Sequence, residues 1–268
     1  MLFIRSIGVC EVFAVQRVSI SSMRIAIVSS PRSGSSWVRS VLANSLDLRE
    51  IAVHNYLDAP APLPPRCIIQ VHWYREPNFQ RFLVENEFRS VVIGRHPLDV
   101  LLSVLQFIRH EPETSQWLLG NAEIPLELAG QSPSSDAFAD YALGWGAENL
   151  LSVTYQWWHD EHALRVRYED LVKGSNEKFV ALVGALASEA PRQRLDESLQ
   201  RFDFNYFHSL PNQHGWQGRA GLWRRLIPAR TARAIYRRHR HLFDALGYDV
   251  PWTLTTRQQA MRNWEALS

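Results

Sequence analysis

Five consecutive residues have types that suit the binding of an anion: Arg32, Ser33, Gly34, Ser35 and Ser36. The apolar run over 24–29 before them predicts a buried strand, and the pattern over 36–46 predicts a helix that begins at these residues. Helices begin with unpaired N–H groups and a partial positive charge, which attract anions. Glycine admits a close backbone approach, the serines add hydroxyl donors and the arginine adds a fixed charge. The sequence predicts a seat for a phosphate-like group, so a nucleotide is the first ligand to consider.

This loop does not fit the ATPase pattern G-x-x-x-x-G-K-[ST], because Ser29 stands at the first glycine position and Ser35 at the lysine position. The stretch S-P-R-S-G-S-S-W, which ends at Trp37, instead resembles the P-K-S-G-T-T-W loop of sulfotransferases that use 3′-phosphoadenosine 5′-phosphosulfate (PAPS). The change from Lys to Arg at position 32 keeps the charge. The resemblance implies that this loop, Trp37 included, binds the cofactor. A serine-rich turn with glycine is also common before ordinary helices.

Arg95 and Ser103 form a second pair. Arg95 follows the expected strand 88–94, and Ser103 lies inside the expected helix 97–108. The segment V-I-G-R-H-P-L-D-V-L-L-S resembles the V-x-R-N-P-x-D-V-x-x-S segment of the same family, with His96 in place of the usual Asn. The resemblance implies that Arg95 and Ser103 hold the 3′-phosphate of the cofactor, at some distance from the sulfated end that Arg32 binds. Taken alone, both residues are ordinary for their positions.

His72 ends the apolar stretch 67–72 and is the candidate general base, because imidazole accepts a hydroxyl proton near neutral pH. It is similar to the His of the family's K-T-H-L-P stretch, although Gln70 replaces the Lys and Trp73-Tyr74 replaces Leu-Pro. The chain has ten histidines, most of which are expected to be structural or exposed. His54 is the alternative base.

Two later segments also resemble the family. Arg167-Tyr-Glu-Asp-Leu171 matches the Y-E-D-L segment, which implies that Tyr168 lines the adenine pocket, although such a tyrosine also packs in cores. The run from Gly218 to Arg224 is similar to the late R-K-G-x-x-G-x-W-K loop, with Trp216-Gln217 in place of Arg-Lys. Gly218 and Arg219 are therefore expected to take over part of the cofactor clamp. Core packing is the favoured interpretation of Phe204, as of any single ring in the aromatic run 204–207, and a second ring that stacks on adenine is the alternative.

The elements that must position these residues alternate between strands and helices. Expected strands cover 24–29, 67–72, 88–94 and 163–168; expected helices cover 36–46, 77–86, 97–108, 136–158, 176–187, 191–201 and 228–246. This order predicts an α/β fold of the P-loop-like, three-layer type, with a central parallel sheet flanked by helices. The Pro-rich stretch 59–65 and the lid-like segment 110–135 are expected to shape the acceptor pocket, and 203–227 is expected to be irregular.

Composition bounds the remaining possibilities. The chain has 268 residues and a net charge of +2, which favours neither a nucleic-acid surface nor an acidic tail. Two cysteines, Cys10 and Cys67, form neither a disulfide framework nor a metal cluster, and fit a reducing cytoplasm. No membrane span is expected. Residues 1–22 are interpreted as an N-terminal extension or a mis-called start before a single domain over 23–268, with an extra edge element as the alternative.

The resemblance spans about residues 24–248 and implies a cytoplasmic sulfotransferase that moves the sulfuryl group of PAPS to an acceptor hydroxyl or amine, without a metal. It implies that His72 is the base, and that Arg32 and backbone N–H groups stabilise the leaving 5′-phosphate, releasing adenosine 3′,5′-bisphosphate (PAP). The acceptor is expected to be a small molecule, a glycan or a lipid. An ATP-dependent P-loop kinase and a non-catalytic nucleotide-binding homologue remain alternatives, and the oligomeric state is open.

Overall fold

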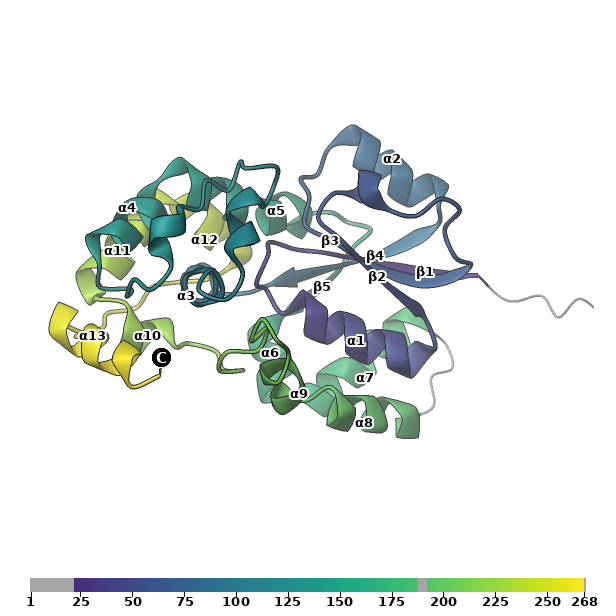
Figure 1. Cartoon of the computed structure of the whole chain (residues 1–268). Helices are drawn as coiled ribbons and strands as arrows, with labels where there is room; N and C mark the ends of the chain where they lie inside the picture. The colour runs from purple at the N-terminus through teal and green to yellow at the C-terminus, as the bar shows by residue number, and fades with distance from the viewer. Residues whose placement is uncertain (1–21, 188–191, 268) are drawn as a thin grey trace, which may run out of the picture.

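A five-stranded parallel sheet forms the centre of the computed structural model, which describes residues 22–187 and 192–267 (Figure 1). The spatial order is β2-β3-β1-β4-β5, and every neighbouring pair is parallel. The strands are β1 (Met23–Val28), β2 (Arg49–Val53), β3 (Arg66–Val71), β4 (Phe88–Gly94) and β5 (Leu164–Arg167). The expected α/β fold is thereby confirmed, with one strand more than the four expected. The missed strand, β2, is a half-exposed edge strand, so its sequence lacks the continuous apolar run that marks the buried ones.

Alternate residues of β1 point to opposite faces of the sheet and belong to two separate hydrophobic clusters. Ile25 and Ile27 pack in the cluster that contains α1, α7 and α8, whereas Ala26 and Val28 pack in the cluster that contains α2 and α5. Both faces of the sheet are therefore covered by helices, which gives the three expected layers (Figure 1). These helices are α1 (Ser35–Leu46), α2 (Pro77–Glu85), α5 (Trp145–Trp158), α7 (Ser175–Leu186) and α8 (Arg192–Arg201).

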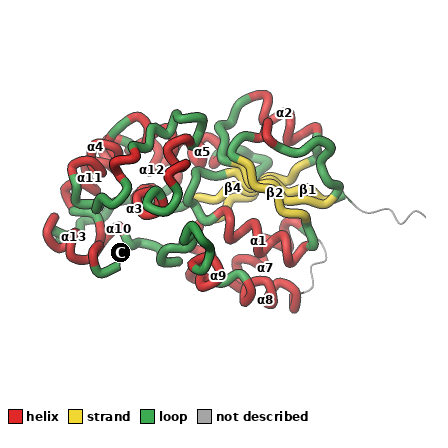
Figure 2. The backbone as a smooth tube through the Cα atoms, in the orientation of Figure 1, coloured by secondary structure: helices red, strands yellow, loops and turns green. Residues whose placement is uncertain are grey.

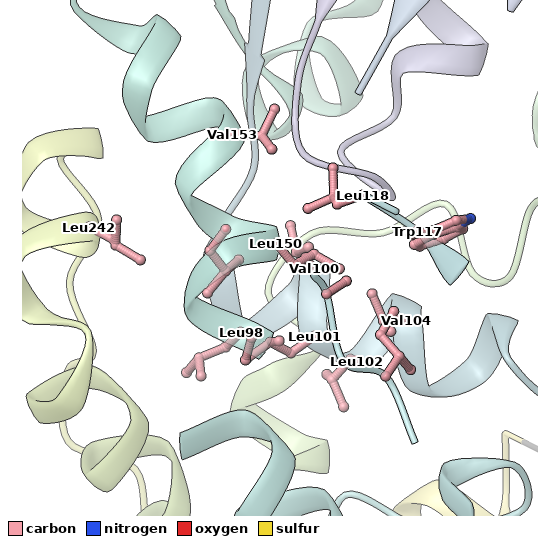
Figure 3. Close-up of a cluster of buried hydrophobic side chains, with 14 of the residues drawn as sticks. Leu98, Val100, Leu101, Leu102, Val104, Trp117, Leu118, Leu150, Val153 and Leu242 are labelled. Carbon is pink, nitrogen blue, oxygen red and sulfur yellow. The ribbon is translucent and has the colours of Figure 1, made fainter. Parts of the chain in front are cut away.

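A second group of helices gathers beyond the carboxyl ends of the strands, at the left of Figures 1 and 2. It includes α3 (Pro97–Phe107), α4 (Asp136–Leu143), α10 (Trp223–Leu226), α11 (Ala229–Arg238), α12 (Arg240–Leu246) and α13 (Arg257–Glu265). Helix α3 is buried along its whole length. Figure 3 shows its side chains Leu101 and Val104 in one cluster with Leu150 of α5 and Trp117 of the following segment. This packing fixes the helix that carries Ser103.

Two helices expected to be continuous are each divided. Residues 136–158 form α4 and α5, because Gly144 adopts an extended conformation between them. Residues 228–246 form α11 and α12, which meet at His239, a fully buried residue whose Nε2–H donates to the carbonyl of Ala142. The expectation that 203–227 is irregular was wrong in part, since it contains the short helices α9 (Phe204–His208) and α10.

Short elements complete the described chain. They are α6 (Tyr168–Lys173) and the 3₁₀ turns η1 (Tyr56–Asp58), η2 (Pro112–Gln116) and η3 (Leu126–Leu128). Among the described residues, no helix is long and apolar enough to cross a membrane. Residues 1–21, on which the expectation of an N-terminal extension depends, lie outside the described residues, and Cys10 lies there too.

Asp99, in the first turn of α3, joins that helix to the late loop of the chain. Its carboxylate is 1% exposed and accepts the N–H of Gly221 at 2.6 Å and the N–H of Trp223 at 2.9 Å. Burial raises the pKa of this carboxyl, and Arg95 and the two N–H donors act against that rise. The carboxylate therefore does more than complement the helix dipole, because it holds the loop after Gly218 against α3.

Replacing this carboxylate by an amide is expected to destabilise the fold. Asp99→Asn leaves one oxygen for two N–H donors and turns an NH₂ group toward one of them, which costs about 2 kcal/mol of unfolding free energy. Urea unfolding followed by circular dichroism measures the loss. Asp140→Asn, at an exposed aspartate, is the matched control. Equal midpoints for the two variants would contradict the role assigned to Asp99.

Candidate active site

One large cavity, of about 1320 Å³, lies where the carboxyl ends of the strands meet the helical group. Residues that follow four of the strands line it: Arg32 after β1, His54 after β2, His72 after β3 and Arg95 after β4. Open parallel sheets bind ligands in this position. The cavity therefore brings together most of the residues that the sequence singled out, from segments far apart along the chain.

Arg32 lies at the centre of this arrangement. Its backbone has a φ of 68°, its Nε donates to Ser103 Oγ at 3.1 Å, and its guanidinium lies 4.0 Å from the centre of the Phe107 ring. Arg95 in turn donates from Nη1 to the backbone carbonyl of Arg32 at 2.8 Å. The Arg32 group and the Arg95–Ser103 pair, which were expected to lie some distance apart, are thus joined by hydrogen bonds of the Arg32 side chain and backbone.

Arg32 and Arg95 carry two positive charges that no described carboxylate neutralises in an ion pair. Burial, and then the charge of Arg95, lower the pKa of Arg32 to about 9. The buried Nε of Arg95 has no hydrogen-bond partner among residues 22–187 and 192–267. Such a pair is stabilised by an anion between or beside the two groups. The residues present therefore fit an anionic cofactor.

Gly34 allows the loop to press against Tyr168. It has a φ of 93°, and a Cβ at this position would lie 2.6 Å from Cδ2 of Tyr168. The ring of Tyr168, at the first residue of α6, lies under the Arg95 guanidinium at 4.4 Å and meets the Trp37 ring edge-on. Tyr168 is 7% exposed, so it both packs in the interior and lines the cavity.

His72 is buried at the cavity wall and both of its ring nitrogens are engaged. Nδ1 lies 2.7 Å from the carbonyl oxygen of Ser29, to which it donates its proton, and Nε2 accepts from Gln70 Nε2 at 3.0 Å. In this tautomer Nε2 carries the lone pair, and Gln70 occupies it in the structure. Burial lowers the pKa of His72 to about 3, so the ring is neutral at physiological pH. The alternative base, His54, is exposed, with its ring centre 5.9 Å from that of His72.

The sequence did not point to His214, which the structure places in the cavity. Its ring lies 2.9 Å (Nε2) from Ser36 Oγ, and its backbone carbonyl accepts a 2.7 Å hydrogen bond from Arg32 Nη2. Arg39 was missed as well, although it is three residues from Ser36 on the same side of α1. Its Nη1 donates to Gln70 Oε1 at 2.9 Å. His214 had no comparable signal, because the segment around it has no periodic pattern.

The late loop reaches the cavity through part of its expected residues. Trp216, Gln217, Gly218 and Phe204 line the cavity, and a Cβ at Gly218 would lie 2.7 Å from the Phe204 ring. Arg219 is exposed and is not among the lining residues, so the structure does not bring this expected clamp to the site. Trp216, which replaces the expected arginine, packs against Trp264 of α13 with ring centres 5.2 Å apart.

The remaining expected residues divide between the cavity and its surroundings. Ser35, Ser36 and Trp37 line the cavity, whereas Ser33 is buried outside the lining, with no partner for its Oγ among the described residues. The segment 110–135 contributes residues from 111 to 119, as expected. The Pro-rich stretch 59–65 does not contribute, so the expectation that it shapes the pocket was wrong.

His96, the departure from the usual Asn, acts as the N-cap of α3. Its Nδ1 accepts the N–H of Leu98, and its Nε2–H donates to the carbonyl of Asp249. Asn caps helices by accepting the same kind of bond. The substitution therefore keeps the beginning of the helix that follows Arg95.

Comparisons with known proteins identify the fold. The chain matches no family model, and no curated protein matches its sequence. Among solved structures, mouse sulfotransferase SULT7A1 complexed with PAP has a TM-score of 0.64 at 16% identity, over 82% of this chain and 84% of that one. Retinol dehydratase in complex with androsterone and inactive cofactor PAP has a TM-score of 0.58 at 15% identity, over 85% and 82%. Retinol dehydratase with retinol and PAP gives 0.56 at 15%, over 85% and 83%. The chain has the fold of these proteins.

The lowered pKa of His72 predicts a pH-dependent stability. The unfolded ring takes up a proton below pH ~6.5, and the folded ring does not until about pH 3, so acidification favours unfolding. The free energy of unfolding should therefore fall between pH 7 and pH 5, with about 2 kcal/mol of the fall due to His72. Urea unfolding at both pH values measures it.

The variant His72→Gln removes this titration and should lose correspondingly less stability between the two pH values. The matched control His162→Gln removes an exposed imidazole and should behave like the wild type. An identical pH dependence for wild type and His72→Gln would show that the folded ring titrates normally.

Proposed function

We propose that the chain is a PAPS-dependent sulfotransferase, which transfers a sulfuryl group to the hydroxyl or amine of a small acceptor. The observation that carries the proposal is the pair of unneutralised arginines, Arg32 and Arg95, in one cavity with the neutral imidazole of His72. The fold shared with PAP-bound sulfotransferase structures supports it. So do the motifs that occur in the family's order from residue 29 to residue 224.

The chain's own residues supply charge and orientation. Arg32, with the N–H groups at the beginning of α1, stabilises negative charge that develops on a departing phosphate. Arg95 and Ser103 bind the other anionic end, and Tyr168, Trp37 and Phe204 provide ring faces for a purine. When bound, PAPS supplies a sulfuryl group that is already activated by its attachment to a phosphate.

His72 takes the acceptor proton at Nε2. An acceptor hydroxyl that replaces Gln70 as the partner of this nitrogen is oriented by the lone pair and gives up its proton as its oxygen becomes nucleophilic. The proton then rests on Nε2, and the bond from Nδ1–H to the Ser29 carbonyl stabilises the imidazolium. The lowered pKa keeps the lone pair free of solvent protons before the acceptor binds.

The acceptor half of the cavity combines an aromatic and apolar surface with polar side chains, among them Asp58, Glu111 and Glu113. Trp73, Phe107, Trp117 and Leu119 line it, next to His72. Pockets of this composition bind small molecules with large apolar surfaces. Retinol and androsterone occupy the related retinol dehydratase structures, which supports a small-molecule acceptor here over a glycan.

Two alternatives make different ligand predictions. A P-loop kinase requires ATP with Mg²⁺, and a non-catalytic homologue binds nucleotide without turnover. Calorimetry on the full chain should show PAP binding at micromolar affinity and no comparable heat with ATP-Mg²⁺. The same titration repeated in high salt should be weaker, because the site pairs arginines with phosphates. Tighter binding of ATP-Mg²⁺ than of PAP would replace this proposal by the kinase.

Two variants test the roles of the catalytic residues. Arg32→Ala should lower turnover by ~10²-fold or more, because it removes charge stabilisation from the leaving group. His72→Ala should bind PAP like the wild type and lower turnover by about 10²–10⁴-fold. A screen of acceptors with ³⁵S-labelled PAPS measures both, with the exposed residues Arg262→Ala and His159→Ala as controls. Wild-type turnover in His72→Ala would remove His72 as the base.

A further inference from the structure

The contacts around Ser36 can all be hydrogen bonds in only one arrangement of donors and acceptors. Arg39 has no acceptor atom, so the Gln70 atom that it contacts at 2.9 Å is the carbonyl oxygen Oε1. The Gln70 NH₂ group must then face His72 Nε2, which agrees with the donation of His72 Nδ1–H to a carbonyl. Ser36 Oγ lies 3.3 Å from the same Oε1 and therefore donates its single proton to it. Because that proton is used, the 2.9 Å contact with His214 requires His214 Nε2–H to donate to Ser36.

In this arrangement the Ser36 hydroxyl donates to Gln70 Oε1, and it can turn to donate to a bound anion instead. Gln70 Oε1 keeps its bond from Arg39 when Ser36 turns away, so the cost of releasing Ser36 is small. Ser36 lies in the first turn of α1, where unpaired N–H groups attract an anion. His214 continues to donate to Oγ throughout the turn, because a hydroxyl oxygen accepts and donates at the same time. The imidazole thus holds the oxygen in place while its proton changes partner.

His214 is itself held on both sides. Its carbonyl accepts from Arg32 Nη2 at 2.7 Å, and the centre of its ring lies 5.5 Å from that of Phe107, edge to face. The next residue, Gly215, donates its N–H to the carbonyl of Phe207 at 2.9 Å, and a Cβ there would lie 2.8 Å from Phe207 Cβ. His214 thus contacts both Arg32 and the hydroxyl of Ser36, although it follows them by about 180 residues in the sequence.

We propose that His214 is a positioning residue for the 5′-phosphate end of the sulfuryl donor, which it orients through the hydroxyl of Ser36. The proposal rests on the proposed function, because it takes PAPS, and its product PAP, as the ligand. It assigns to the segment before Gly218 a role that no motif in the sequence indicated. His214 touches neither the acceptor nor the reacting atoms in this role; it orients a group that does.

The test measures PAP binding to the full chain by calorimetry. His214→Ala and Ser36→Ala should each weaken binding about tenfold, and the double variant should be no weaker than Ser36→Ala, because the two side chains act as one unit. His214→Gln should recover most of the affinity, since its amide N–H reaches the position of Nε2. His214→Asn, one methylene shorter, should not. In turnover assays the KM for the donor should rise in His214→Ala while the KM for the acceptor stays unchanged.

The outcomes separate the inference from the proposed function. If the wild type does not bind PAP, both are overturned. If the wild type binds PAP and His214→Ala binds it equally well, or the losses of the two single variants multiply in the double variant, only the role of His214 is overturned. His214→Gln and His214→Asn place amides of similar polarity at the same position, so a difference in PAP affinity between them does not reflect a folding defect. The control His162→Gln, at an exposed histidine, should leave PAP affinity unchanged.

Discussion

Two guanidinium groups without a carboxylate partner among the described residues are the constraint around which the cavity is built. Arg32 and Arg95 repel each other and have lost part of their hydration, which the lowered pKa of Arg32 reflects. Aromatic rings and neutral acceptors compensate in part: Phe107 lies over Arg32, Tyr168 over Arg95, and Ser103 and a backbone carbonyl accept from Arg32. These partners carry no charge, so the positive potential is preserved for a ligand. An internal carboxylate would stabilise the free protein more and bind an anion less.

The donor-only character of arginine also determines the polar wall opposite. Arg39 fixes the orientation of Gln70, and Gln70 fixes the tautomer of His72 with its lone pair on Nε2. Arg39, which also forms an ion pair with Glu50 at 2.8 Å, therefore contacts an amide rather than the imidazole itself. Gln70 occupies the Nε2 lone pair in this structure, and a neutral amide is displaced at a smaller cost than a charged guanidinium would be, so an acceptor hydroxyl can replace it. The charge of Arg39 still contributes to the lowered pKa of His72, after burial and His54.

The sequence predicted those parts of the site that depend on local pattern. The buried strands β1, β3 and β4 have continuous apolar runs, and the residues that follow them reach one edge of the sheet, which placed Arg32, His72 and Arg95 together. Strand β2 was missed because an edge strand needs no such run. The contact between Arg32 and Ser103 was missed because the positive φ of Arg32 turns its side chain toward α3, and no sequence pattern records that turn. His214 was missed for a similar reason, since its neighbours form no periodic element.

The late loop shows how a departure from a family pattern is accommodated by packing. Trp216 stands where the resemblance leads one to expect an arginine, and it is buried against Trp264 of α13. Five residues later, the carboxylate of Asp99 fixes the N–H groups of Gly221 and Trp223 to α3. The loop is thus attached to the protein interior at both ends, by apolar burial and by a buried carboxylate. Gly218 lies between the two attachments, so its place in the cavity wall is set by the packing of the protein and not by a charged side chain of the loop.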